Sequence, residues 1–173
     1  MSRNGVEMSK LLIKQKVFTW TATYDVYDGT GRPKYYVKAD MFTIGHRIRV
    51  FDKASGEEIG LIQEKLFRFL REFEISIRGQ SQGIIKKQIS FIKPKYNIDY
   101  KGWRLEGEYF FWNYDIYEQS RLVVHISKKL FTWGDTYVLE IADDEDELPA
   151  LMVAIAMDAA KSSEENAASA MNT

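Results

Sequence analysis

The sequence predicts a mainly β fold, an antiparallel closed barrel of about twelve strands around a buried hydrophobic C-terminal α-helix. Apolar and polar residues alternate through most of the chain, as they do in half-buried strands. Segment 147–161, ELPALMVAIAMDAAK, is different: with Pro149 counted as apolar, every position from Leu148 to Ala160 is apolar except Asp158. A helix that is apolar all round is buried on all sides. We therefore expect the strands to surround this helix.

Six weakly repeated units support the strand count. The clearest pair is KVFTWTATY from Lys16 and KLFTWGDTY from Lys129. Each unit carries an anchor residue, and the anchors are Trp20, Ile44, Phe69, Phe91, Trp112 and Trp133. Alternation with a period of two follows most anchors, so each unit is interpreted as strand, corner, strand. Six such hairpin-like units predict about twelve strands.

Turn-rich links separate the units, at 28–31, 54–56, 79–83, 101–102 and 119–120. Strands are expected to begin after them, over 34–39, 58–63, 84–89, 103–107 and 121–127. A closed barrel hides the edges of so many strands completely. A barrel wider than eight strands needs something inside it, and the apolar helix is a candidate. Two packed sheets with the helix across one face remain the alternative.

One domain is expected, because 173 residues can bury a substantial core. Residues 1–10 are interpreted as an N-terminal tail and 11–161 as the barrel domain with its helix at 147–161. The small, polar residues 162–173 are interpreted as a disordered tail. The five acidic residues 143–147 and Pro149 favour a helix start here, because negative charge stabilises the positive end of the helix dipole.

The composition limits the classes of partner and compartment. The net charge of −1 gives no overall attraction to nucleic acid, which disfavours that partner. Cysteine is absent, which excludes disulfides and thiolate metal sites and fits a reducing compartment. No signal-peptide pattern is present, and the C-terminal apolar run is shorter than the roughly 20 residues of a transmembrane helix. We expect a cytoplasmic protein, peripheral at the membrane if its partner is lipid.

The motifs LLIKQKVFTW, KPKYNIDYKGW and KLFTWGDTY, followed by the DELPALMVAIAMDA helix, resemble the LURP-one-related family. The match runs from about Leu11 to Ala160, and its specificity lies in the order of all the motifs. The resemblance implies a twelve-stranded barrel around a hydrophobic C-terminal helix. Related folds occur in tubby proteins, which bind phosphoinositides, and in phospholipid scramblases. A shared fold does not transfer function, and no tubby lipid-binding motif is found here.

Three patterns that could indicate catalysis or metal binding have simpler interpretations. Residues 79–83, GQSQG, match G-x-S-x-G, but a nucleophile elbow needs a strand leading into a helix, and a strand follows here. His46 and His125 lack partners at catalytic or zinc-site spacing. The acidic run 140–147 lacks the calcium-loop pattern, and helix capping with a solvated lead-in explains it better. The sequence therefore predicts a non-enzymatic protein without metal or cofactor.

The clearest asymmetry is basic. Residues 65–104 hold ten Lys or Arg against three acidic residues, so this stretch carries +7 and the remainder −8. The candidate anion-binding residues are Lys86, Lys87, Lys93, Lys95, Lys101 and Arg104. They predict binding to an anionic phospholipid surface or a protein partner. The alternative is that these residues are only the solvated outer faces of strands, or charges that keep exposed strand edges from pairing with other chains. A second function remains open, a carrier with a small hydrophobic or lipid-like ligand inside the barrel. The tryptophans, with Phe18 and Phe131, would either line such a pocket or pack in the core.

Overall fold

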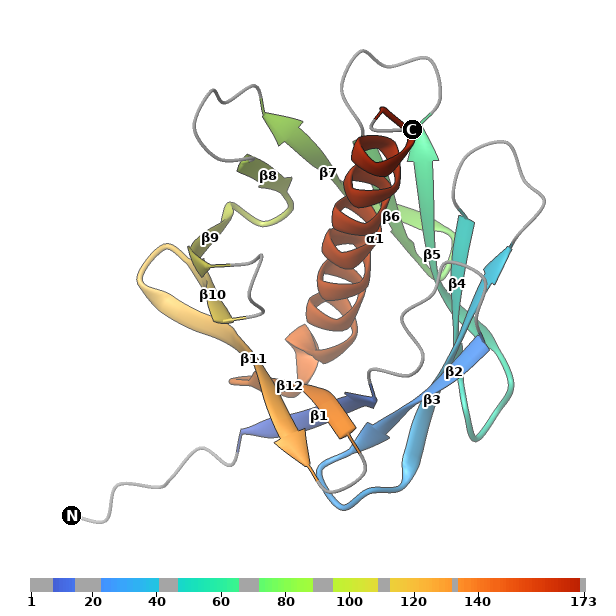
Figure 1. The fold of residues 1–173 in the computed structure, drawn as a ribbon. Coiled ribbons are helices and arrows are strands. Elements are labelled where there is room, and N and C mark those ends of the chain that lie inside the picture. The colour runs from blue at the N-terminus through green and yellow to red at the C-terminus, as the bar shows by residue number, and fades with distance from the viewer. Residues whose placement is uncertain are drawn as a thin grey trace.

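A computed structural model describes residues 8–14, 23–40, 47–65, 72–88, 95–108, 113–131 and 134–171 (Figure 1). Twelve strands surround one long helix, and a short 3-10 helix, η3, precedes it. The elements are β1 (Ser9–Lys14), β2 (Thr23–Asp28), β3 (Pro33–Asp40), β4 (Arg47–Asp52), β5 (Glu58–Lys65), β6 (Glu72–Ile77), β7 (Gln80–Gln88), β8 (Lys95–Asp99), β9 (Trp103–Glu108), β10 (Asn113–Glu118), β11 (Arg121–Phe131), β12 (Gly134–Ile141), η3 (Asp144–Asp146) and α1 (Glu147–Met171).

The strands form one antiparallel sheet whose order is β8-β7-β6-β5-β4-β3-β2-β1-β12-β11-β10-β9. Strand β1 joins the two parts of the sheet, β2 to β8 and β9 to β12, because it pairs with β2 on one side and with β12 on the other. The sheet curls so that its end strands, β8 and β9, lie next to each other along the chain (Figure 1). The predicted twelve-stranded barrel is confirmed, as a nearly closed barrel with a seam between β8 and β9.

The six hairpin-like units are also visible in the ladder. The two strands of each unit, from β1 with β2 to β11 with β12, are hydrogen-bonded neighbours. The register shifts in four of the intervening hairpins, at Val26/Tyr27, Val50/Phe51, Ile75/Ser76 and Ile116/Tyr117. An extra residue at such a bulge bends the strand and increases its twist, so the repeated shifts help the sheet to curl.

Helix α1 passes through the middle of the ring of strands (Figure 1). Its side chains from Ala150 to Met157 are at most 2% exposed, and they form one core with the inward side chains of the strands. Gly60 of β5 shows how closely the two layers approach, because a Cβ at this position would lie 2.6 Å from the Sδ atom of Met152. The inside of the barrel is therefore occupied by the helix, as the sequence predicts.

The helix extends beyond its predicted end. It continues to Met171 instead of ending at Lys161, so residues 162–171, for which the sequence predicts part of a disordered tail, are helical. Residues 172–173 lie outside the described part. The extension is rich in alanine and glutamate, which are good helix formers. At the other end of the chain, β1 begins at Ser9, inside the predicted tail. No helix in the described part of the chain is long and apolar enough to span a membrane.

Tight turns gather at the end of the barrel where α1 begins, between β2 and β3, β4 and β5, β6 and β7, β8 and β9, and β10 and β11. Asp28 and Asp52 each close a turn by accepting backbone hydrogen bonds through Oδ1. The predicted link at 79–83 is shorter in the structure. The turn is Arg78 and Gly79, both at positive φ, and β7 already begins at Gln80. The six anchor residues, Trp20, Ile44, Phe69, Phe91, Trp112 and Trp133, lie outside the described residues.

Candidate functional site

The predicted basic residues lie on neighbouring strands beside the seam. Strand β7 carries Lys86 and Lys87, β8 carries Lys95, and β9 carries Arg104. Lys101 lies in the turn between β8 and β9. The side chains of Lys87 and Lys95 are not described, and Lys93 lies outside the described residues. Four of the six positions thus lie on three consecutive strands, and a fifth, Lys101, lies in the turn that joins two of them.

Each of the three described side chains has a carboxylate nearby. The pairs are Lys86 Nζ to Glu72 Oε1 at 3.8 Å, Lys101 Nζ to Asp146 Oδ1 at 3.6 Å, and Arg104 Nη2 to Glu106 Oε1 at 2.7 Å. The three basic side chains remain 42%, 42% and 57% exposed, in that order. Asp146, the partner of Lys101, is fully buried, whereas Lys86 and Arg104 pair with carboxylates that are themselves partly exposed, and ion pairs of this second kind contribute only about 0–1 kcal/mol. Lys86 and Arg104 can therefore still interact with an anion that approaches from solvent.

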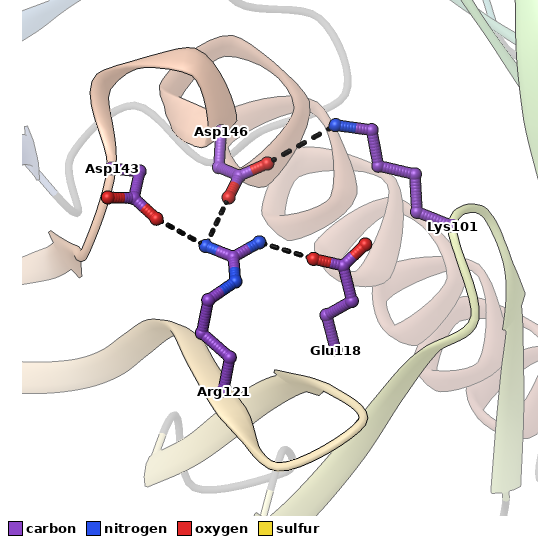
Figure 2. Close-up of polar contacts among 5 residues, drawn as sticks. All are labelled: Lys101, Glu118, Arg121, Asp143 and Asp146. Atoms are coloured by element: carbon purple, nitrogen blue, oxygen red, sulfur yellow. Dashed lines mark hydrogen bonds and ion pairs between the residues drawn. The ribbon is translucent and has the colours of Figure 1, made fainter.

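A denser polar cluster lies at the tight-turn end, around Arg121 at the start of β11 (Figure 2). Its Nη1 atom donates to Asp143 Oδ2 at 2.5 Å and to Asp146 Oδ2 at 2.8 Å, and its Nη2 atom donates to Glu118 Oε2 at 2.5 Å. Hydrogen bonds to Glu118 and then Asp146 raise the pKa of Arg121, which keeps it charged. Lys101 approaches Asp146 from the β8–β9 turn. The cluster thus fastens the segment before α1 to the strands.

A second contact of the same kind holds the first residue of α1. Glu147 Oε1 accepts a hydrogen bond from the Tyr35 hydroxyl at 2.6 Å and lies 2.6 Å from Lys34 Nζ. Asp146 is fully buried and Glu147 is 4% exposed, whereas Asp144 and Glu145 are exposed. The interpretation of 140–147 as a solvent-exposed segment before the helix is therefore wrong for Asp146 and Glu147, which are buried. They are buried because strands distant in sequence supply their cationic and hydroxyl partners.

Ser81 and His125 have well-defined neighbours on the outside of the barrel. Ser81 lies in β7, in a strand-to-strand hairpin, and its Oγ donates to Glu74 Oε1 at 2.7 Å. His125 Nδ1 lies 2.6 Å from Asp115 Oδ1 on the neighbouring strand, and His46 lies outside the described residues. Within the described part of the chain, no group of three or more His, Cys, Asp or Glu side chains could hold a metal ion.

The aromatic residues proposed to line a pocket are only partly visible. Trp103 is 3% exposed in the core, and its ring meets Tyr100 edge to face at 4.7 Å between centroids. Trp20, Trp112, Trp133 and Phe18 lie outside the described residues, and the side chain of Phe131 is not described. A shallow open depression of about 350 Å³ lies elsewhere on the outer surface, lined by Tyr36, Phe51, Asp52, Lys53 and Gly56.

The structure therefore adds a polar cluster that sequence reasoning missed, made of Lys34, Tyr35, Arg121, Asp146 and Glu147. The sequence indicates only part of this cluster: acidic residues before an apolar segment predict the start of a helix. Their partners are Lys34 and Tyr35 of β3 and Arg121 of β11, and nothing local in the sequence identifies them.

Comparisons with known proteins agree on the fold and the family. The LURP-one-related family model matches residues 9–158. The uncharacterised protein YxjI of Bacillus subtilis (strain 168) is 31% identical over 151 residues, which cover 87% of this chain and 93% of that protein. An Arabidopsis thaliana protein of known X-ray structure shares the fold with a TM-score of 0.59 at 13% identity, over 89% of this chain and 91% of that one. The chain belongs to the LURP-one-related family.

Proposed function

We propose that this protein is a non-enzymatic binding module that associates with an anionic phospholipid surface through the outer face of β7, β8 and β9. The observation that carries the proposal is the gathering of Lys86, Lys95, Lys101 and Arg104 on these three strands and their turn. Each basic residue near a negatively charged membrane contributes on the order of 1 kcal/mol. Several together supply a useful affinity without a deep pocket.

The filled interior supports a role for the outer surface. The side chains of α1 from Ala150 to Met157 occupy the space that a lipid-like ligand would need. A carrier function would require the helix to leave, which exposes a large apolar area at a cost of about 25 cal/mol per Å². We therefore favour surface binding over the alternative of a hydrophobic ligand inside the barrel. The lack of cysteine fits a cytoplasmic location at the inner membrane surface.

Vesicle co-sedimentation tests the proposal. We expect the protein to sediment with vesicles of phosphatidylcholine and phosphatidylserine at low salt but not with pure phosphatidylcholine. Binding should weaken as the salt concentration rises, because salt screens interactions between exposed charges. Equal sedimentation with both kinds of vesicle, or none with either, contradicts the membrane proposal.

A pair of charge-matched variants tests the location. The triple variant Lys86→Glu, Lys95→Glu and Arg104→Glu should lose most of the binding to anionic vesicles. The control variant Lys38→Glu, Lys128→Glu and Lys129→Glu changes the net charge equally but on β3 and β11. It should bind within about threefold of the wild type. If both triple variants lose binding alike, the overall charge governs binding and the β7–β9 face is not the site.

A further inference from the structure

Lys101 differs from the other described basic residues of the β7–β9 face in the carboxylate that it contacts. Its Nζ atom lies 3.6 Å from Oδ1 of Asp146, which is fully buried, whereas Lys86 and Arg104 pair with carboxylates that are 19% and 53% exposed. Two charges interact more strongly where protein replaces water, because the effective dielectric constant is lower there. Asp146 therefore holds Lys101 more firmly than the exposed carboxylates hold Lys86 and Arg104.

Asp146 in turn depends on Lys101, because its other cation is shared. Asp146 Oδ2 accepts a hydrogen bond from Arg121 at 2.8 Å, but the same guanidinium also binds Asp143 and Glu118 (Figure 2). Three carboxylates thus share one guanidinium, and Lys101 supplies the second positive charge of the group. Within the described part of the chain, Asp146 Oδ1 accepts no hydrogen bond, and 3.6 Å is longer than an ordinary N–H···O bond. The contact between Lys101 and Asp146 is therefore an electrostatic one.

Lys101 also reaches solvent. Its side chain is 42% exposed, and it lies in the turn between β8 and β9, within the proposed membrane-binding face. A lysine ammonium has three N–H donors on a flexible stem, so it can turn toward a phosphate or carboxylate oxygen outside the protein. Asp146 and such an anion are both negative and compete for one ammonium. Each of them therefore weakens the interaction of Lys101 with the other.

We propose that Asp146 restrains Lys101 and thereby lowers the affinity of the β7–β9 face for anionic phospholipid. The contact is autoinhibitory, and this inference rests on the proposed membrane association, to which it adds a means of regulation. Coupling between two sites is reciprocal. An anionic surface that attracts Lys101 therefore loosens the segment before α1, and loosening of that segment increases the affinity for the surface.

A comparison of two Asp→Asn variants in vesicle co-sedimentation tests the restraint. Asp146→Asn removes the charge that holds Lys101 but keeps an oxygen that can accept from Arg121. It should bind vesicles of phosphatidylcholine and phosphatidylserine about threefold to fivefold more tightly than the wild type, because one basic residue near a charged membrane contributes roughly that factor.

Asp143→Asn is the matched control. It changes the net charge equally and also removes a carboxylate from Arg121, but in the described part of the chain the ion pair of Asp143 is with Arg121 and not with Lys101. Its vesicle affinity should stay within about 1.5-fold of the wild type at about 0.15 M salt, where exposed charges more than about 8 Å apart are largely screened.

The gain in affinity must depend on Lys101. In the Lys101→Met background, Asp146→Asn should change the vesicle affinity by less than about 1.5-fold, because the residue that it releases is absent. A merely structural effect of Asp146→Asn, such as a general loosening of the start of α1, would change the affinity in both backgrounds alike.

Hydrogen exchange of the wild type decides the question if Asp146→Asn does not fold. The N–H of Asp146 donates to the carbonyl of Asp143 at 3.0 Å, so its exchange reports on the segment before α1. Exchange at residues 144–147 should be faster with vesicles that contain phosphatidylserine than with pure phosphatidylcholine, because the anionic surface draws Lys101 away from Asp146. Unchanged exchange would then overturn the inference.

With a folded Asp146→Asn protein, three results overturn the inference: vesicle affinity equal to that of the wild type, including binding by neither protein, an equal gain in Asp143→Asn, or an equal gain in the Lys101→Met background. If the wild type binds anionic vesicles selectively and Asp146→Asn binds no better, the membrane proposal stands and the restraint fails. If only Asp146→Asn binds, the restraint is supported and the wild type fails the membrane test. The two failures can therefore be told apart.

Discussion

At the scale of single residues, Arg121 is a side chain whose loss should disturb several contacts at once. It is hydrogen-bonded to Glu118, Asp143 and the fully buried Asp146. We expect Arg121→Met to lower the free energy of unfolding by about 2–3 kcal/mol. This is less than the roughly 3–5 kcal/mol for breaking a fully buried pair, because the Arg121 side chain is 37% exposed. Urea denaturation measures the change.

A double-mutant cycle separates this contact from general effects of substitution. Asp146→Asn removes the charge that Arg121 neutralises, so the two substitutions together should cost less than the sum of their separate effects. We expect a coupling of at least about 1 kcal/mol, as is usual for residues in one ion-pair network. Additive losses would mean that Arg121 and Asp146 do not stabilise each other.

The sequence could predict only one side of this contact. Acidic residues before an apolar helix indicate a helix start, and that prediction placed the helix correctly at Glu147. Burial of Asp146 and Glu147 depends on Arg121, Lys34 and Tyr35, which reach them only after the barrel has curled. Sequence separations of this size, 25 residues for Arg121 and 112 for Tyr35, leave no local pattern.

At the scale of elements, α1 shows what hydrophobic patterning can and cannot predict. The run from Leu148 to Ala160 has no polar face, and nearly all of it is buried inside the barrel. Judged by its apolar residues alone, the helix is predicted to end too early. An apolar pattern indicates which part of a helix is buried, whereas helix formation also depends on the intrinsic propensity of each residue. Residues 162–171 lack the apolar pattern but contain several alanines and two glutamates, and they continue the helix.

The central helix should not tolerate a charge. Ala154 and Ile155 are 1% and 2% exposed, so Ala154→Asp or Ile155→Asp places an unpaired carboxylate in the core. The cost of several kcal/mol is comparable with the whole stability of an ordinary domain. We expect either variant to be unfolded or insoluble by circular dichroism and size-exclusion chromatography. Ile155→Val is the control and should lose only about 0.5–1.5 kcal/mol. A soluble Ile155→Asp protein with unchanged cooperative unfolding would place the helix outside the core.

At the scale of the whole molecule, the barrel was predictable but its seam was not. Alternating apolar residues determine which side chains point inward, and the six units indicate how many strands there are. Neither pattern says which pair of neighbours fails to form a ladder. The turn Lys101–Gly102 even resembles a paired hairpin turn, so local chemistry predicts closure at the point where the barrel is open. The gathering of basic residues beside the seam likewise depends on the strand order.

The filled barrel also makes a prediction about high pH. Burial raises the pKa of Tyr24 and Tyr114, and burial together with the hydrogen bond to Glu147 raises that of Tyr35. A group whose pKa is higher in the folded state stabilises the fold fully below its unfolded pKa, about 10 for tyrosine, and this contribution is lost as the pH rises above that value. The free energy of unfolding should therefore fall as the pH rises above about 10.

Ultraviolet absorbance at 295 nm, which reports tyrosinate, provides the measurement. The chain has ten tyrosines. While circular dichroism shows the protein to be folded, absorbance should rise as exposed tyrosines ionise and then stop short of the value for all ten. The remaining increase should appear only together with unfolding, because the buried hydroxyls lose their protons when water reaches them. If all ten tyrosines ionise reversibly near pH 10 with the fold intact, water already reaches Tyr24 and Tyr114, and the barrel is not filled by its helix.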